Sequence, residues 1–172
     1  MTLIIPEGVL TLGNEAVQWV PAIASPGIAA VTVAECTAGK PTQCVIKAFN
    51  PKVEQGASQD VRHCTTTKLE TAGLKSYSID PIEVIHDPQT PTSATDYALY
   101  TAWKSQPSGF LVVRRGIAHG AAFAVAQIVD VYPVRVQFLG RVGAEGGSDG
   151  DKFRSTFKLY VTGEPVFDRA LS

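Results

Sequence analysis

The best candidate for a catalytic residue in this sequence is Ser148, which stands at the centre of a G-x-S-x-G pattern, Gly146–Gly150. Where this pattern supplies a nucleophile, it forms a sharp turn between a strand and a helix that exposes the serine hydroxyl. Residues 152–161 instead alternate between apolar and polar side chains, which predicts a strand. We therefore interpret the segment as a hairpin tip and not as a nucleophile.

A second pattern, Gly39-Lys40, is similar to the end of a phosphate-binding loop. Such a loop needs an earlier glycine, but that position holds Ala34. It also needs a serine or threonine after the lysine, where this chain has Pro41. No helix is expected to follow, so the sequence predicts no phosphate site here.

The three histidines, His63, His86 and His119, lie far apart and have no spacing typical of metal ligands. Glu83 and His86 are close in sequence, but an extended strand would direct them to opposite faces. We interpret all three histidines as structural or surface residues. The sequence thus predicts no metal site, no cofactor and no enzymatic activity.

Arginines are the remaining candidates, because their side chains suit phosphate groups. Arg114 and Arg115 are adjacent, so on a strand they face opposite ways and cannot form one clamp. Arg135 and Arg141 lie on another expected strand. We interpret all four as solvated or salt-bridged surface of a sheet.

The cysteines, Cys36, Cys44 and Cys64, are odd in number and form no C-x-x-C pattern. An odd number of cysteines without this pattern argues against a disulfide framework and against a zinc site. Cys36 and Cys44 could face each other across a hairpin through residues 39–41, and the sequence leaves open whether they pair. In a reducing cytoplasm we interpret the three thiols as small buried apolar side chains.

The composition excludes several functional classes. Fifteen basic and 16 acidic residues give a net charge of −1, which argues against nucleic-acid binding through bulk positive charge, although not through a local patch. Only 18% of the residues are charged, against about 25% in an average soluble domain. No apolar stretch reaches the roughly 20 residues of a membrane span. No basic residue precedes Lys40, so no secretory signal is expected, and the chain should stay in the cytoplasm in which it is made.

The first 30 residues differ from the rest of the chain. They contain 17 apolar residues and only two charges, Glu7 and Glu15, and prolines and glycines interrupt them repeatedly. Such a segment cannot form a long helix and must cover its apolar side chains elsewhere. It is either a first strand with its loops or an arm that docks on another subunit.

From residue 31 onward the dominant pattern is the alternation of apolar and polar side chains, which predicts half-buried strands. The expected strands cover residues 31–34, 45–49, 61–67, 75–86 with a break at Pro81, 110–115, 123–132, 134–142 with Pro133 as an interruption, and 152–161. The expected loops are residues 50–60, 87–95 and 143–150.

One helix is expected, at about residues 94–105. Leu99, Ala102 and Trp103 are spaced to form one apolar face, and Ser93 or Thr95 would cap the first turn. Because strands and helices do not alternate along the chain, we expect an antiparallel β-sandwich or barrel with this one flanking helix. It forms a single domain, residues 1–172, with an extended N-terminal arm of about residues 1–30 and a short C-terminal tail of about residues 163–172.

The order of certain motifs is similar to that of a known family. The motifs are a strand Tyr77–Pro81, the run Ile85–Gln89, a short helix with Tyr97, Leu99 and Trp103, a strand Phe110–Gly116, the run Val131–Arg135 and the closing segment Phe157–Pro165. In this order the chain resembles the major tail tube proteins of long-tailed, non-contractile bacteriophages. The resemblance covers about residues 60–170 and extends more loosely over the N-terminal segment.

The resemblance implies a β-sandwich with a flanking helix, assembled as hexameric rings that stack into a tube in the virion tail. The tube would enclose the tape-measure protein, meet tail terminator and distal tail proteins at its ends, and pass DNA without binding it specifically. No membrane partner is implied. The candidate subunit-interface residues are Leu3, Ile4, Ile5, Val9, Leu10, Lys52, Glu54, Gln55, Arg141, Glu145, Ser148 and Asp149.

Three other functions stay open. A related virion part, such as a tail terminator, head–tail connector or head-decoration protein, would form a single ring or a trimer. A binding module would be monomeric with one concave site. A small enzyme would assemble its site from distant residues such as His63 and Asp87.

Three expectations follow for a tube. Residues 1–12 should pack on a neighbouring subunit, since burying Leu3, Ile4 and Ile5 would contribute about 1.5–3 kcal/mol each. At least one of the segments 50–60 and 143–150 should become ordered on contact with the next ring. The bore should be neutral or acidic, because basic side chains would hold the DNA phosphates.

Overall fold

The computed structural model describes residues 10–24, 27–28, 30–42, 45–46, 48–60, 69–89, 97–143 and 152–172. Its elements in chain order are β1 (Glu15–Val20), α1 (Val33–Ala38), β2 (Lys40–Pro41), β3 (Pro51–Asp60), β4 (Leu69–Ile79), β5 (Ile82–Ile85), α2 (Ala98–Lys104), β6 (Ser108–Arg115), β7 (Ile128–Val142), β8 (Arg154–Val161) and β9 (Val166–Ala170).

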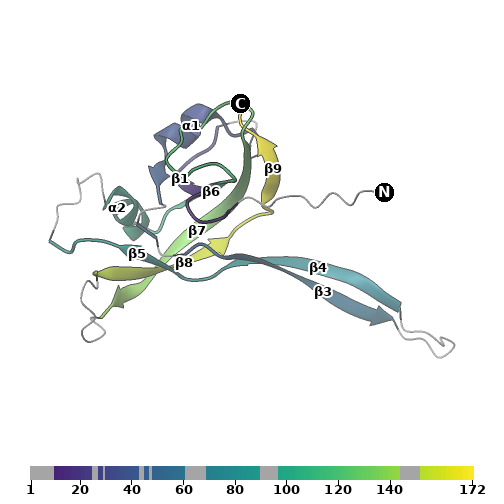
Figure 1. Cartoon of the computed structure of the whole chain (residues 1–172). Helices are drawn as coiled ribbons and strands as arrows, with labels where there is room; N and C mark the ends of the chain where they lie inside the picture. Colours follow the sequence, from purple (N-terminus) through teal and green to yellow (C-terminus); the bar gives the residue numbers. More distant parts are fainter. Residues whose placement is uncertain are drawn as a thin grey trace.

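Seven of the described strands form one antiparallel sheet in the order β2-β1-β6-β7-β8-β5, with β9 paired to the first part of β7. The sheet curls into a half-barrel, and β3 and β4 form a separate two-stranded ribbon that extends away from it (Figure 1). The prediction of a mainly β, antiparallel fold with a flanking helix is therefore confirmed.

The core lies on both faces of the central strands. Ala16–Val20 of β1 and Leu111–Arg114 of β6 are buried without interruption, as expected for apolar runs covered on both sides. The larger cluster lies on one face and includes Trp19 and Trp103, whose rings meet edge to face at 5.8 Å. A smaller cluster lies on the other face and includes Cys36 of α1.

Gly109 is the residue that lets Trp19 pack against β6. A Cβ atom at this position would lie 2.5 Å from Cη2 and from Cζ2 of the Trp19 ring. We expect Gly109→Ala to lower the free energy of unfolding by about 1–3 kcal/mol, because a buried tryptophan would have to move. Gly120→Ala is the control, since a Cβ atom there meets nothing within 4 Å. Urea titration of both variants measures the effect, and equal stabilities would contradict it.

Pro133 does not interrupt β7, contrary to the sequence prediction. The carbonyl of Pro133 accepts a hydrogen bond from the Thr162 amide at 2.9 Å, on the side of β8. In an antiparallel strand the N–H and C=O groups of one residue point to the same side. The missing N–H therefore faces the gap between β9, which pairs up to Val131, and β8, which pairs from Val134, so no ladder hydrogen bond is lost.

The prediction of a strand at residues 31–34 is wrong, because α1 begins at Val33. Thr32 Oγ1 accepts a hydrogen bond from the Glu35 amide at 3.2 Å, and Glu35 Oε2 accepts one from the Thr32 amide at 2.9 Å. This reciprocal capping box starts a helix in a segment too short for hydrophobic periodicity to show it. Cys36 is a buried free thiol in this helix and not in a hairpin, while Cys44 and Cys64 lie outside the described residues.

The expected second helix is present as α2. Leu99 and Trp103 are its buried residues, as predicted, but its N-cap position is Tyr97, whose side chain makes no capping hydrogen bond. Ser93 and Thr95, the predicted caps, lie outside the described residues.

Several other expected boundaries differ. Residues 45–46 contribute only an isolated bridge, Ile46 to Val84. β7 begins at Ile128, not at residue 123, so Val125 is 70% exposed instead of lying on a buried face. Phe153 precedes β8 and is 63% exposed. The break at Pro81 is confirmed between β4 and β5, while the expected strand at 61–67 and residues 144–150 of the expected loop lie outside the described residues.

Candidate assembly surfaces

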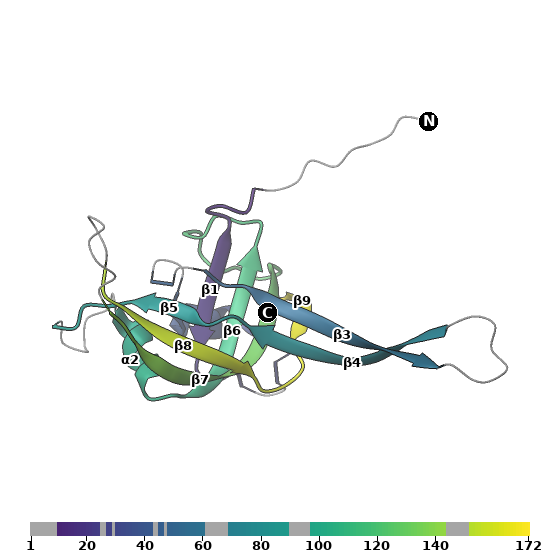
Figure 2. The same ribbon diagram turned by 90° about the horizontal axis from the view of Figure 1, so that it is seen from below.

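The most prominent surface is the two-stranded ribbon, β3 and β4, which projects from the half-barrel in two perpendicular views (Figures 1 and 2). All side chains from Lys52 to Ser58 are exposed, as are those of residues 70–72 and 74–76. Val53 and Leu74 are 55% and 93% exposed. The sequence prediction of a loop at residues 50–60 is therefore wrong: the segment is a strand with no buried face.

The base of the ribbon is fastened to the body. Ile79 is buried in the core, and its carbonyl accepts a hydrogen bond from Lys158 Nζ at 2.7 Å. Lys52 Nζ lies 2.8 Å from Asp80 Oδ1. The ring of Tyr77 meets that of Phe167 with centroids 6.5 Å apart. A two-stranded hairpin is at best marginally stable in water, so packing against a further surface would stabilise the exposed part of this ribbon.

A bulge divides the ribbon. The register shifts between Gln55 and Ala57, and a Cβ atom at Gly73 would lie 2.7 Å from the Gly56 carbonyl oxygen. Gln55 Nε2 donates to the Gly73 carbonyl at 3.2 Å. Two glycines thus allow the backbones to approach closely where the ribbon bends, as is typical of β-bulges.

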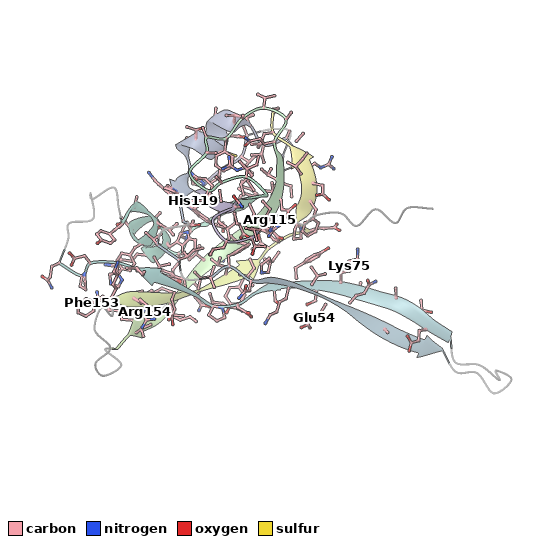
Figure 3. All side chains as sticks on the ribbon, viewed as in Figure 1. Glu54, Lys75, Arg115, His119, Phe153 and Arg154 are labelled. Carbon is pink, nitrogen blue, oxygen red and sulfur yellow. The ribbon has the colours of Figure 1, made fainter. Side chains whose placement is uncertain are left out.

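The structure brings some of the predicted interface residues together. Lys52, Glu54 and Gln55 all lie on β3, and Figure 3 shows Glu54 and Lys75 on the ribbon, clear of the body. Leu10 is 80% exposed in the segment before β1. Arg141 is also described and lies on β7. The remaining candidates lie outside the described residues: Leu3, Ile4, Ile5, Val9, Glu145, Ser148 and Asp149.

Arg141 lies on the exposed face of β7. Along this strand exposed and buried side chains alternate, as predicted. Arg135, Gln137, Leu139 and Arg141 are exposed, whereas Val134 and Val136 are buried. The neighbouring strands β8 and β5 are tied by an ion pair in which Arg154 Nη1 lies 3.0 Å from Glu83 Oε2. Phe153 and Arg154 lie together on the side of the molecule opposite to the ribbon (Figure 3).

Arg114 was misplaced by the sequence analysis, because it is fully buried and not on the surface. Its Nη1 donates to the Ala122 carbonyl at 2.9 Å and to Gln127 Oε1 at 3.1 Å. Its Nη2 donates to the carbonyls of Ala118 and Ala121 at 2.9 and 2.8 Å. Within the part of the chain described, no carboxylate pairs with this guanidinium, and burial lowers its pKa from the ordinary arginine value.

These hydrogen bonds fix the loop between β6 and β7, residues 116–127. The ring of Phe123 covers the guanidinium at 4.6 Å. Arg115, the next residue, faces the opposite side and pairs with Glu15 at 3.5 Å and with Asp130. The prediction that the two arginines face opposite ways is confirmed, and the signal that one is buried was its place in the apolar run Phe110–Arg114.

His86 is the one described histidine in the core. It is 4% exposed, it stacks on Tyr100 at 4.1 Å with 6° between the rings, and neither ring nitrogen has a hydrogen-bond partner among the described residues. Burial lowers the pKa of His86 below its usual range, and the nearby charge of Arg141 acts in the same direction. His119 is exposed, and His63 lies outside the described residues.

Acid should therefore destabilise the fold through His86. The unfolded chain binds a proton below about pH 6.5 while the folded ring stays neutral, so stability is lost as the pH falls from there. Between about pH 7 and pH 5, urea titrations of the natural chain should show a larger loss than those of His86→Phe, by up to about 1.4 kcal/mol per pH unit. His119→Gln should behave as the natural chain does, and identical pH profiles for all three proteins would contradict the prediction.

The described residues contain no group of three or more potential metal ligands. None of the helices that the structure describes is long and apolar enough to cross a membrane. The exposed surfaces that stand out among the described residues are the ribbon of β3 and β4 and the loop of residues 116–127.

A family model described as "Phage tail tube protein" matches residues 2–172. Among solved structures, a chain of "Cryo-EM structure of the anti-feeding prophage (AFP) baseplate, 6-fold symmetrised" is similar with 12% sequence identity and a TM-score of 0.49, over 95% of this chain and 98% of that chain. No curated protein matches the sequence.

Proposed function

This chain belongs to the phage tail tube protein family and is a structural protein of the virion tail, and we propose that it polymerises as hexameric rings stacked into the tube of a long, non-contractile tail. The tube encloses the tape-measure protein during assembly and conducts DNA during ejection. The chain has no catalytic role in this proposal. The observation that carries it, beyond the family, is the ribbon formed by β3 and β4.

The ribbon supports self-assembly because its exposed described side chains, those of Lys52 to Ser58 and of residues 70–72 and 74–76, would gain packing against another chain. Rings and open stacks require different, complementary faces on each subunit, since a two-fold contact would end the assembly as a dimer. A ribbon on one side of the body provides one such face. Lys52, Glu54 and Gln55 of β3 then lie in contacts between subunits, as the sequence analysis proposed.

The other proposed contacts come from residues 1–12 and from Arg141, together with Glu145, Ser148 and Asp149. Tail terminator and distal tail proteins would cover the faces that the last ring at each end leaves open. These partners need no site of their own, because they can use the surfaces that join one ring to the next.

The bore is proposed to be neutral or acidic, so that DNA slides through it. Each phosphate held by a lysine or arginine would add salt-dependent affinity. On β7 the exposed face carries Arg135 and Arg141. If basic residues avoid the bore, this face meets a neighbouring subunit or the outside of the tube. A map of the tube with a continuous ring of lysine or arginine along the bore would contradict this.

Electron microscopy of the purified protein tests the proposal directly. Long tubes with six-fold symmetry are the expected result. Single rings or trimers at all protein concentrations would indicate another virion part, such as a terminator, connector or decoration protein. A protein that remains monomeric at every concentration and salt condition would overturn the proposal.

A further inference from the structure

We propose that the loop of residues 116–127 is the docking site for residues 1–9 of a second copy of this chain. The inference rests on the proposed self-assembly and names the surface that receives the N-terminal segment. It is carried by the exposure of the loop, by the hydrogen bonds that fix it, and by the chemistry of residues 1–9.

The loop presents an apolar surface to solvent. Among residues 116–127, His119 is the one ionisable residue, and most of the others are alanine, glycine or larger aliphatic residues. Val125 is 70% exposed, and Ile128, directly after the loop, is 50% exposed. Leu10 and Leu12, in the segment that precedes β1, are 80% and 94% exposed. Exposed apolar residues gathered in one place are typical of a contact site.

Hydrogen bonds join the start of the loop to Gly13 and Asn14, which follow Leu10 and Leu12 in the sequence. The Gly116 amide donates to the Asn14 carbonyl at 2.9 Å, and the His119 amide donates to the Gly13 carbonyl at 2.8 Å. Figure 2 shows the loop between β6 and β7 beside the segment that leads into β1. At its far end the Ala126 amide donates to the Leu171 carbonyl at 2.9 Å. The loop thus lies between the start of β1 and the C-terminus as one continuous surface.

The loop is also rigid before any partner arrives. Arg114 holds three of its carbonyls and Gln127 from beneath, and Ala126 has a φ of 67°, a left-handed conformation that the surrounding contacts must impose. A surface whose shape is already fixed loses little entropy on binding. A buried arginine without a carboxylate is a costly way to hold a loop, which indicates that the shape of the loop is used.

Residues 1–9 match this surface in chemistry and length. They contain Leu3, Ile4, Ile5 and Val9 with a single charge, Glu7. Pro6 opposes a helix and favours an extended chain, and nine extended residues span about 30 Å, enough to lie along a loop of this size. In a ring every copy carries one segment and one loop, so each copy donates once and receives once, which closes the ring without leaving either unused.

Photo-crosslinking of the full chain tests the inference. Val125 is replaced by p-benzoylphenylalanine, and this protein is assembled together with nitrogen-15-labelled natural chain. After irradiation of the sedimented assemblies, mass spectrometry should find residues 1–9 joined to the loop, with a labelled peptide attached to an unlabelled one. The control carries the same photoreactive residue at Leu139, which is 53% exposed on β7, and should give no product with residues 1–9.

The outcomes separate this inference from the proposed function. If tubes form but the Val125 products join other residues, or join residues 1–9 only within one chain, the docking site is wrong and the tube stands. If single rings form, the stacked tube is contradicted. The crosslink between residues 1–9 of one copy and the loop of another then still tests the docking site. If the protein stays monomeric, both fail.

A substitution supplies a second readout. Val125→Asp should leave the thermal unfolding temperature of the subunit unchanged, because this side chain is exposed, and should abolish the sedimentable fraction. Val125→Ile should assemble as the natural chain does. Normal assembly of Val125→Asp would overturn the inference.

Discussion

Replacing residues 54–76 with a two-residue Asn-Gly turn is expected to give a folded subunit that forms no tubes. Val53 and Tyr77 are directly paired across the ribbon, so a short turn can join them without disturbing its base. The core contacts of Ile79 and the Lys158 hydrogen bond are retained. The described side chains of the deleted part, at residues 54–58, 70–72 and 74–76, are exposed, so the thermal unfolding temperature should change little, while electron microscopy should show no assembly.

The truncated subunit should also stop the growth of others. In the proposed assembly it would keep the surface that receives a neighbour's ribbon, but it would offer no ribbon to the next subunit. Small amounts added to the natural chain should therefore shorten the tubes, as measured by electron microscopy. Tubes of normal length from the truncated protein alone would show that the ribbon is not an assembly element.

Arg114→Met should have the largest effect on stability of any single arginine substitution among the described residues. The side chain makes four hydrogen bonds from a buried charged group, each worth roughly 1.5–3 kcal/mol, and part of this gain offsets the cost of burying the charge. We expect a loss of about 2–4 kcal/mol in the free energy of unfolding. Amide exchange should become faster throughout residues 116–127, while the amides of β1 keep most of their protection.

Arg115→Met is the matched control, because it is the next residue in sequence but lies on the exposed side of the strand. Its pairs with Glu15 and Asp130 are partly solvated, so its loss should cost less than about 1 kcal/mol. Exchange in residues 116–127 should be unchanged in this variant. Similar losses for the two variants, measured by urea titration, would contradict the role assigned to Arg114.

Sequence patterns predicted the fold where the core imposes them. Alternation along Val134–Val142 was correct because one face of β7 is buried and the other is exposed. β3 was missed for the opposite reason: the ribbon leaves the core, so neither face selects apolar residues. Helix α1 was missed because six residues are too few for a period, although the Thr32–Glu35 capping box was readable in the sequence.

The candidate surfaces were less predictable than the fold. The interface candidates on β3 were chosen as part of a polar loop, but the segment is a strand, and their place in an interface stays a prediction. Arg114 could be identified as a strand residue, but its partners are backbone carbonyls of Ala118, Ala121 and Ala122, and a carbonyl leaves no mark in a sequence. Only the folded loop shows why a charge is tolerated there.

The bulge at Gly56 and Gly73 also bears on when growth begins. If the ribbons of two free subunits met edge to edge, both edges would be bent at the bulge and would carry charged side chains such as Lys52, Glu54 and Lys75. A bulge and charged side chains both disfavour pairing between identical edges. A growing end, in contrast, holds its receiving surfaces already in place. Polymerisation should therefore show a long lag from free subunits and none from a preformed seed, so that the start of each tail is decided by a template and not by subunit concentration.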